Sequence, residues 1–372
     1  MVQPVGVGYR RAVHAVAAIA GFALVLTIMW EAFETLVLPR RVSRRFRLTR
    51  GYYRLLWGIW SSIGTHHPGP RRENYLSVFA PLSLLLLLAF WVAGSILGFA
   101  LIEWGLQAPF APGGTLALPA YLYVSTTTFV TLGLGDVTPL SSLGRFLTGI
   151  EAIAGFGFLA LTIAYLPVLY QAFSRREVRI SMLDQWAGSP PTSVELLRRS
   201  ASKGTLSSVD RLLEDWELWS SELLESHLSY PVLAYFRSQH EQESWLAALT
   251  TILDTCSLVL AGVDEISGWQ AWRTFAIARH AVVDLAQVLR IEPMLPPADR
   301  LVDGEADRMI EILSTADVKF DPAAIARLTA LRRKYEPYVY GLSLRVQMPL
   351  PSFLPAPDAV DDWERSAWTL PS

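Results

Sequence analysis

One stretch in the first half of the chain, residues 128–136, combines hydroxyl side chains with closely spaced glycines. It reads Thr-Phe-Val-Thr-Leu-Gly-Leu-Gly-Asp. Glycine visits unusual backbone conformations at little steric cost, so Gly133 and Gly135 allow consecutive carbonyls to point to the same side. A row of carbonyl oxygens, with one threonine hydroxyl below it, can replace the water around an alkali cation. The stretch is therefore suited to cation binding, and a glycine-rich turn between two helices is the simpler alternative.

The whole pattern resembles the selectivity filter of the potassium-channel pore family, which runs Thr-x-x-Thr-x-Gly-(aromatic or Leu)-Gly-Asp. The resemblance covers about residues 75–173. It implies a filter strand formed by Thr131, Leu132, Gly133, Leu134 and Gly135, with K⁺ held at the first four. One chain supplies one strand, and four strands close the ring, so the resemblance also implies a homotetramer.

Four further residues stand where the family supports its filter: Tyr123, Thr127, Thr128 and Asp136. The resemblance places Asp136 just outside the filter, although a turn residue is the alternative there. Tyr123 lies where some members have a tryptophan that hydrogen-bonds this carboxylate, and a phenol can donate the same bond. Thr127 stands where some members carry a glutamate. Leu134 replaces an aromatic residue, which removes any aromatic hydroxyl bond behind the filter.

The apolar segment 141–173 resembles the family's inner helix. Gly155 occupies the place of a frequent hinge glycine, and Gly157 adds a second flexible point. Pro167 removes a helix hydrogen bond and is expected to kink the helix. The alternative is that the glycines only permit close packing between helices. Glu151 is expected to pair with a polar group behind the filter.

Composition places the chain in a membrane and gives no sign of catalysis. Hydrophobic residues make up 52% and charged residues 18%, against about 25% charged in soluble domains. The net charge of -2 does not indicate a nucleic-acid partner, and the single Cys256 excludes an intrachain disulfide. No phosphate loop or nucleophile–base pair is recognisable. We therefore expect no enzyme, no catalytic cofactor and no metal other than the transported K⁺.

Three apolar segments are long enough to cross a bilayer, which takes about 20 residues: 12–38, 75–102 and 141–173. Glu31 and Glu34 interrupt the first, and they are expected at the headgroup level or facing nearby arginines. A first helix that does not cross is the alternative topology. Residues 40–72 hold nine arginines, whereas 103–140 contain no lysine or arginine. The positive-inside rule then places the basic segment inside and the filter mouth outside.

This orientation predicts a multi-pass protein of the plasma or inner membrane, with its N-terminus outside and its C-terminal part in the cytosol. Within the basic segment, residues 47–63 alternate arginines with aromatic and apolar residues. We expect a helix there that lies on the inner membrane surface and contacts membrane lipids. A site for a particular anionic lipid is the weaker alternative.

The fold class expected is an all-α membrane protein, namely a pore-loop channel domain with an extra N-terminal helix and an all-helical cytosolic domain. Its four expected parts are residues 1–74, 75–173, 174–347 and a loosely ordered, proline-rich tail, 348–372. Cytosolic helices are expected at 208–228, 243–260, 269–291, 298–313 and 323–335. Asp254 interrupts the apolar run 243–260, which favours a buried core helix over a fourth span. Residues 189–193 are expected to form a linker that ends in a helix cap.

The resemblance implies passive, potassium-selective conduction through a tetrameric pore. A weakly selective cation channel is one alternative. A membrane signalling or scaffold protein with a non-conducting pore is another. The sequence of the helical domain does not indicate which ligand or protein it binds.

Overall fold

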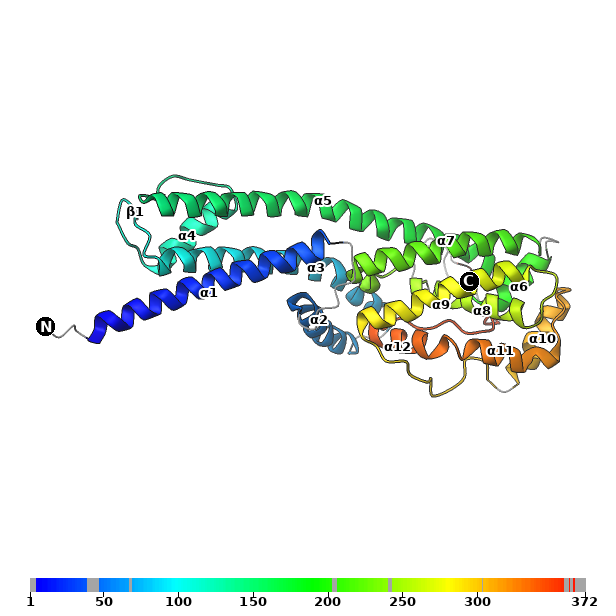
Figure 1. The fold of residues 1–372 in the computed structure, drawn as a ribbon. Coiled ribbons are helices and arrows are strands. Elements are labelled where there is room, and N and C mark those ends of the chain that lie inside the picture. The colour runs from blue at the N-terminus through cyan, green and yellow to red at the C-terminus, as the bar shows by residue number, and fades with distance from the viewer. Residues whose placement is uncertain are drawn as a thin grey trace. The chain divides into compact units, whose positions relative to one another are not determined.

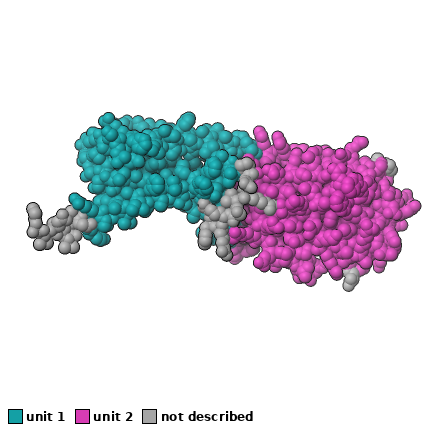
Figure 2. All heavy atoms as spheres, in the orientation of Figure 1, with its two compact units in different colours: residues 1–59, 81–169 teal, residues 60–80, 170–372 magenta. Residues whose placement is uncertain are grey.

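The computed structural model describes residues 5–38, 47–66, 69–202, 206–239, 243–302, 304–357, 361 and 364. Arg40, Arg41, Arg44 and Arg45 of the basic segment, and most of the tail beyond residue 357, lie outside the described residues. The chain forms two compact units, coloured separately in Figure 2. Unit 1 comprises Met1–Ile59 and Pro81–Leu169, and unit 2 comprises Trp60–Ala80 and Tyr170–Ser372.

The helices that run through unit 1 are drawn in blue to green in Figure 1. They are α1 (Val5–Leu36), α2 (Leu48–Gly64), α3 (Pro70–Gly105), α4 (Leu118–Phe129) and α5 (Ser142–Ala187). Three of them, α1, α3 and α5, are long and apolar enough to cross a membrane, which agrees with the three predicted spans. Two short strands, β1 (Phe110–Ala111) and β2 (Thr138–Pro139), pair antiparallel on either side of α4 in the sequence.

Helix α1 packs tightly against α3, because small residues meet where the two helices cross. A β-carbon at Gly21 would lie 2.5 Å from the carbonyl oxygen of Gly98 on α3. Close contact of this kind provides dispersion energy between helices in a membrane, where the hydrophobic effect provides little. Ile28 of α1 and Trp91 of α3 are buried in the same cluster. The N-terminal helix is thus an integral part of unit 1.

The two glutamates near the end of α1 are buried and have polar partners. Glu31 accepts hydrogen bonds from the backbone N–H and the hydroxyl of Thr49, at 3.1 and 2.8 Å. Glu34 accepts from the Trp30 indole at 2.7 Å and lies 3.8 Å from Arg47. The expectation that they face nearby arginines is therefore confirmed for Glu34. Through its bond to Thr49, Glu31 also satisfies a free backbone N–H at the start of α2.

Unit 2 is a helical bundle around one apolar helix. Its remaining elements are α6 (Ser193–Ser202), α7 (Ser208–Ser229), η1 (Pro231–Tyr235), α8 (Trp245–Gly262), α9 (Gly268–Leu289), α10 (Glu305–Thr315), η2 (Pro322–Ala324), α11 (Ile325–Arg332) and α12 (Glu336–Val346). Helix α8 could span a membrane by length and composition, yet 89% of it is buried inside the unit. It packs against α6, α9 and α11. The prediction of a buried core helix is confirmed.

Several expectations for unit 2 were wrong in detail. The helix expected at 298–313 begins only at Glu305, the helix expected at 323–335 ends at Arg332, and α12 was not expected. The reason is an ion-pair network that sequence periodicity does not reveal. Arg300 donates to both carboxylate oxygens of Asp254 at 2.8 Å and to the carbonyl of Pro351 at 3.0 Å. These bonds stabilise an irregular loop in place of a helix turn.

The C-terminal segment was expected to be loosely ordered, and its described part is packed instead. Met348 and Phe353 are fully buried, and the guanidinium of Arg332 lies 4.9 Å from the Phe353 ring. The predicted linker at 189–193 is also largely buried rather than exposed. Its predicted cap is confirmed at Thr192, whose hydroxyl accepts the backbone N–H of Glu195 at 3.3 Å.

Candidate functional site

The stretch 128–136 is positioned by α4, the short helix that precedes it. The family resemblance implies a pore helix over about residues 118–128, and α4 spans Leu118–Phe129. Pro119 lies in its first turn, where a missing N–H costs nothing. Tyr121 and Phe129 anchor its two ends in the interior of unit 1. The Tyr121 hydroxyl donates to the carbonyl of Ala108 at 2.8 Å. The C-terminal end of α4 is thereby fixed beside the filter residues.

The backbone after α4 takes the left-handed conformation at three positions. Gly133 and Gly135 have φ of 51° and 78°, as the sequence predicts. Thr131 also has a positive φ, 60°, which the sequence did not indicate. For a β-branched residue this conformation is a genuine outlier, and such outliers concentrate at functional sites. The strand is therefore held in an unusual conformation beyond what its glycines require.

Hydrogen bonds to Thr127 determine where the first carbonyls of the strand point. The carbonyl of Thr127 accepts the backbone N–H groups of Leu132 and Gly133, at 2.8 and 3.0 Å. A peptide group is planar and trans, so each carbonyl points opposite to the N–H of the next residue. The carbonyls of Thr131 and Leu132 therefore point away from α4. This places two consecutive oxygens on the same open side of the strand.

The side chains of the strand are exposed in a single chain. Val130, Leu132 and Leu134 are 51%, 60% and 58% exposed. Thr127 and Thr128, which support the strand, are half-buried, and the Thr127 hydroxyl donates to the carbonyl of Val124 at 3.0 Å. Each of these three large apolar side chains is therefore available for contact with lipid or with another protein.

Tyr123 and Asp136 are joined as the sequence suggests. The Tyr123 hydroxyl donates to Oδ2 of Asp136 at 2.8 Å, and both side chains are exposed. The bond links the middle of α4 to the residue that follows the last glycine of the strand. It therefore ties the end of the stretch 128–136 back to the helix that precedes it.

A second polar contact lies on the opposite, buried side of α4. Glu151 of α5 is fully buried and accepts a hydrogen bond from the Ser125 hydroxyl, so its expected polar partner is confirmed. Glu103 of α3 is also fully buried, and it accepts from the Thr148 hydroxyl at 3.3 Å. Sequence reasoning missed Ser125 and Glu103. Their burial depends on helix contacts that no local pattern reveals.

Gly155 lies directly against the end of the pore helix. A β-carbon there would be 2.0 Å from the carbonyl oxygen of Phe129, closer than any side chain can approach backbone. A β-carbon at Gly157 would have no neighbour within 4 Å. Pro167 lies inside α5, which stays helical to Ala187. The geometry thus favours the packing explanation for Gly155, while Gly157 has no packing constraint within the chain.

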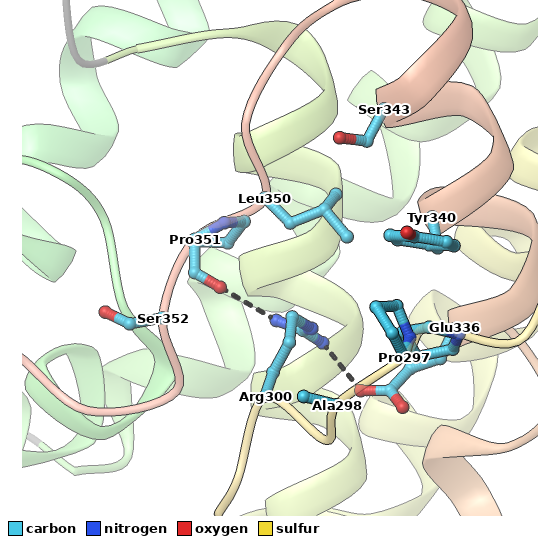
Figure 3. Close-up of a pocket in the computed structure, with 10 residues that line it drawn as sticks. Pro297, Ala298, Arg300, Glu336, Tyr340, Ser343, Leu350, Pro351 and Ser352 are labelled. Carbon is cyan, nitrogen blue, oxygen red and sulfur yellow. Dashed lines mark hydrogen bonds and ion pairs between the residues drawn. The ribbon is translucent and has the colours of Figure 1, made fainter.

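Unit 2 contains a separate cavity of about 430 Å³, drawn in Figure 3. Pro297, Leu350 and Pro351 line it with apolar surface, and Arg300 lies in its wall with hydrogen bonds to Glu336 and Pro351. Among the described residues, no group of three or more His, Cys, Asp or Glu side chains is arranged to hold a metal.

Comparisons with known proteins point to the same segment. A family model described as "Ion channel" matches residues 86–171, from α3 to α5. An uncharacterized membrane protein of Bacillus subtilis (strain 168), YdjJ, is 26% identical to this chain over 224 residues. That match covers 59% of this chain and 62% of YdjJ, which is less than two thirds of its length. No solved structure matches the chain. Residues 86–171 belong to the two-transmembrane pore-loop ion channel family, and they are the channel domain of an all-α membrane protein.

Proposed function

We propose that this protein is a potassium-selective channel that conducts passively through a filter formed by 131–135. The observation that carries the proposal is the orientation of the strand. Positive φ at Gly133 and Gly135 and the two hydrogen bonds to Thr127 direct consecutive carbonyls to one open side. Carbonyl oxygens in this arrangement replace the hydration shell of K⁺. Thr131 adds its carbonyl and hydroxyl at the inner end, and Leu132, Gly133 and Leu134 supply the next carbonyls.

We also propose a homotetramer, as the resemblance to the pore family implies. One strand offers carbonyls to one side of an ion, so four are needed to surround it. The exposed apolar surface of a single chain supports this assembly. Val130, Leu132 and Leu134 at the strand, and Ile153 and Phe156 on α5, are between 51% and 74% exposed. Contact with neighbouring copies would cover the part of this surface that does not face lipid.

We place the filter mouth outside the cell membrane and unit 2 in the cytosol. The reason is that the arginine-rich segment 40–72 and the loop 103–140, which has no lysine or arginine, lie at opposite ends of a predicted span. Labelling of single introduced cysteines tests this topology. Gln107→Cys should react with an impermeant thiol reagent added outside intact cells, whereas Arg50→Cys should not. The reverse result would overturn the orientation. The native Cys256 is buried and provides a low background.

Ion flux into liposomes that contain the purified protein tests the function itself. Potassium and rubidium should pass, and sodium should pass poorly. Equal sodium and potassium permeability would favour the weakly selective alternative, in which the loss of an aromatic residue at Leu134 softens the filter. No flux of any cation across a range of voltage, pH and lipid would favour the non-conducting scaffold.

A further inference from the structure

A short segment of unit 2, residues 231–237, lies between the ends of two long helices. It comprises η1 and the two residues that follow, Phe236 and Arg237. Unit 2 includes the first turns of α3, up to Ala80, and the last turns of α5, from Tyr170. We refer to residues 231–237 as the clasp, because they contact both helix ends.

The clasp holds the end of α5 through a buried arginine. Arg176 is 4% exposed, and its guanidinium donates to the carbonyls of Leu233 and Phe236, at 2.9 Å each. The ring of Phe236 packs on α5 as well, with its centroid 5.3 Å from that of Phe173. On its other side, the backbone carbonyl of Arg176 accepts the Trp219 indole N–H of α7 at 3.2 Å. The end of α5 is thus fixed to both the clasp and the bundle.

The same segment holds the start of α3. The ring of Tyr235 meets that of Phe79 edge to face, with centroids 5.5 Å apart, and Phe79 is 2% exposed. Arg237 pairs with Glu73 at 3.2 Å. Its guanidinium also donates to the carbonyls of Val346 and Gln347 at the end of α12, at 2.7 and 3.0 Å.

Because the clasp contacts both helices, the start of α3 and the end of α5 cannot easily move independently of each other. A guanidinium that donates to several fixed carbonyls cannot shift without leaving a buried charge unpaired, which is costly. Each helix also carries a proline close to where it passes from unit 2 to unit 1, Pro81 in α3 and Pro167 in α5. A proline removes a helix hydrogen bond and makes bending there easier. The helix ends are therefore bound to the bundle, while each helix has a weak point just beyond it.

From this arrangement we propose that the clasp positions the end of the inner helix α5 against the outer helix α3, and that it thereby sets the open probability of the pore. Arg176, Tyr235 and Arg237 act as positioning residues and have no contact with the ion. The bundle of unit 2 is then the element through which a cytosolic signal reaches the pore. This inference rests on the proposed channel function.

Single-channel recording of the full-length protein in planar bilayers tests the inference with Glu73→Gln, Arg237→Gln and the double variant. Glu73 is 32% exposed on its side chain, so its neutral isostere should leave the fold intact. The control is Glu217→Gln, which removes an ion pair to Arg273 (2.9 Å) that joins α7 to α9 and involves neither α3 nor α5. Glu73→Gln and Arg237→Gln, the clasp variants, should each change the open probability in the same direction by on the order of fivefold. The control should leave it unchanged.

The double variant should change the open probability by about as much as the larger single variant, because either single substitution already removes the ion pair between Glu73 and Arg237. The ratio of potassium to sodium permeability should stay at the wild-type value throughout. Wild-type open probability in folded clasp variants would overturn the inference and leave the channel function standing.

If the wild-type protein conducts nothing, the channel proposal fails. In that case amide hydrogen exchange still tests whether the clasp couples α3 to α5. Glu73→Gln on α3 should speed amide exchange at residues 170–180 on α5. Unchanged exchange at these residues would refute the coupling.

Discussion

The phenol of Tyr123 donates a 2.8 Å hydrogen bond to the carboxylate of Asp136, so helix α4 is tied directly to the residue that follows Gly135. Both side chains are exposed, so the bond contributes little to the stability of one chain. Its effect is local, because it holds the residue that follows Gly135. We therefore expect its removal to affect conduction more than folding.

Tyr123→Phe should leave assembly and melting temperature close to wild type and should shorten the time for which the pore stays conducting. Asp136→Asn weakens the same bond and should act in the same direction. Tyr9→Phe is the control, since Tyr9 is 74% exposed on α1. Macroscopic current decay in bilayers is the measurement. Identical decay in wild type and Tyr123→Phe would show that the bond does not support the filter.

Gly135→Ala should abolish potassium flux or selectivity over sodium. Its φ of 78° costs a residue with a side chain about 1–2 kcal/mol, and four copies of the substitution meet at one axis. No atom would clash with the new methyl group within the chain, so the effect comes from backbone conformation alone. Gly149→Ala, in the helical conformation with nothing within 4 Å, is the matched control. Normal selectivity in Gly135→Ala, measured by liposome flux, would exclude this strand as the filter.

Thr131→Ala should be milder than Gly135→Ala. It removes a ring of hydroxyls and keeps every carbonyl, so potassium occupancy should fall at the inner site only. Thr131 has a φ of 60°, and alanine carries less of the steric cost of a β-branched residue there. Blocker or rubidium binding to the inner site should weaken while the order of permeability stays the same. A complete loss of selectivity in Thr131→Ala would contradict this prediction, because it would show that the Thr131 hydroxyl affects more than the inner potassium site.

Gly155→Ala should disturb the filter and not only the gate. The new methyl group would lie 2.0 Å from the carbonyl oxygen of Phe129, so α4 or α5 must move. Overpacking of this kind costs about 1–3 kcal/mol. Both the melting temperature and the ratio of potassium to sodium permeability should fall. Gly157→Ala has no neighbour within 4 Å and should leave both unchanged. Altered open probability with intact selectivity in Gly155→Ala would restore the hinge interpretation.

His227 makes unit 2 sensitive to acid. Burial and the neighbouring Arg176 lower the pKa of His227 well below its usual value of about 6.5. Its ring donates from Nδ1 to the carbonyl of Leu223 at 2.9 Å, and Nε2 lies 3.3 Å from Arg176, an arrangement that suits the neutral ring. In the folded protein it stays neutral while the unfolded chain binds a proton.

The unfolded state therefore binds more protons below pH 6.5, and stability falls as the pH decreases from there, by up to about 1.4 kcal/mol per pH unit. Above pH 6.5 both states are neutral and this residue adds no pH dependence. The melting temperature of the wild type should decrease from pH 7 to pH 5. His227→Gln should melt lower at pH 7 and show a smaller decrease on acidification. An equal decrease in both proteins would assign the acid sensitivity to other groups.

The sequence by itself determined the features that depend on local spacing. The pattern 128–136, the pore helix before it and the three apolar spans could all be recognised, because glycine spacing and uninterrupted apolar length are properties of adjacent residues. The partner of Asp136 could also be predicted, because Tyr123 stands where some members of the family that the chain resembles carry a tryptophan that bonds this carboxylate. The buried helix α8 followed from the same reasoning, since one charged residue interrupts its apolar run.

Only the tertiary structure decided which distant residues meet. Glu103 and Glu151 come from different helices and are buried near the pore helix, and Gly155 meets the backbone of Phe129. The clasp contacts residues of α3 and α5 that lie more than fifty positions away along the chain. The irregular loop at Arg300 and the packed segment at Phe353 replaced an expected helix and an expected tail. Each depends on ion pairs and aromatic contacts between elements, and the free energy of those contacts outweighs local propensity.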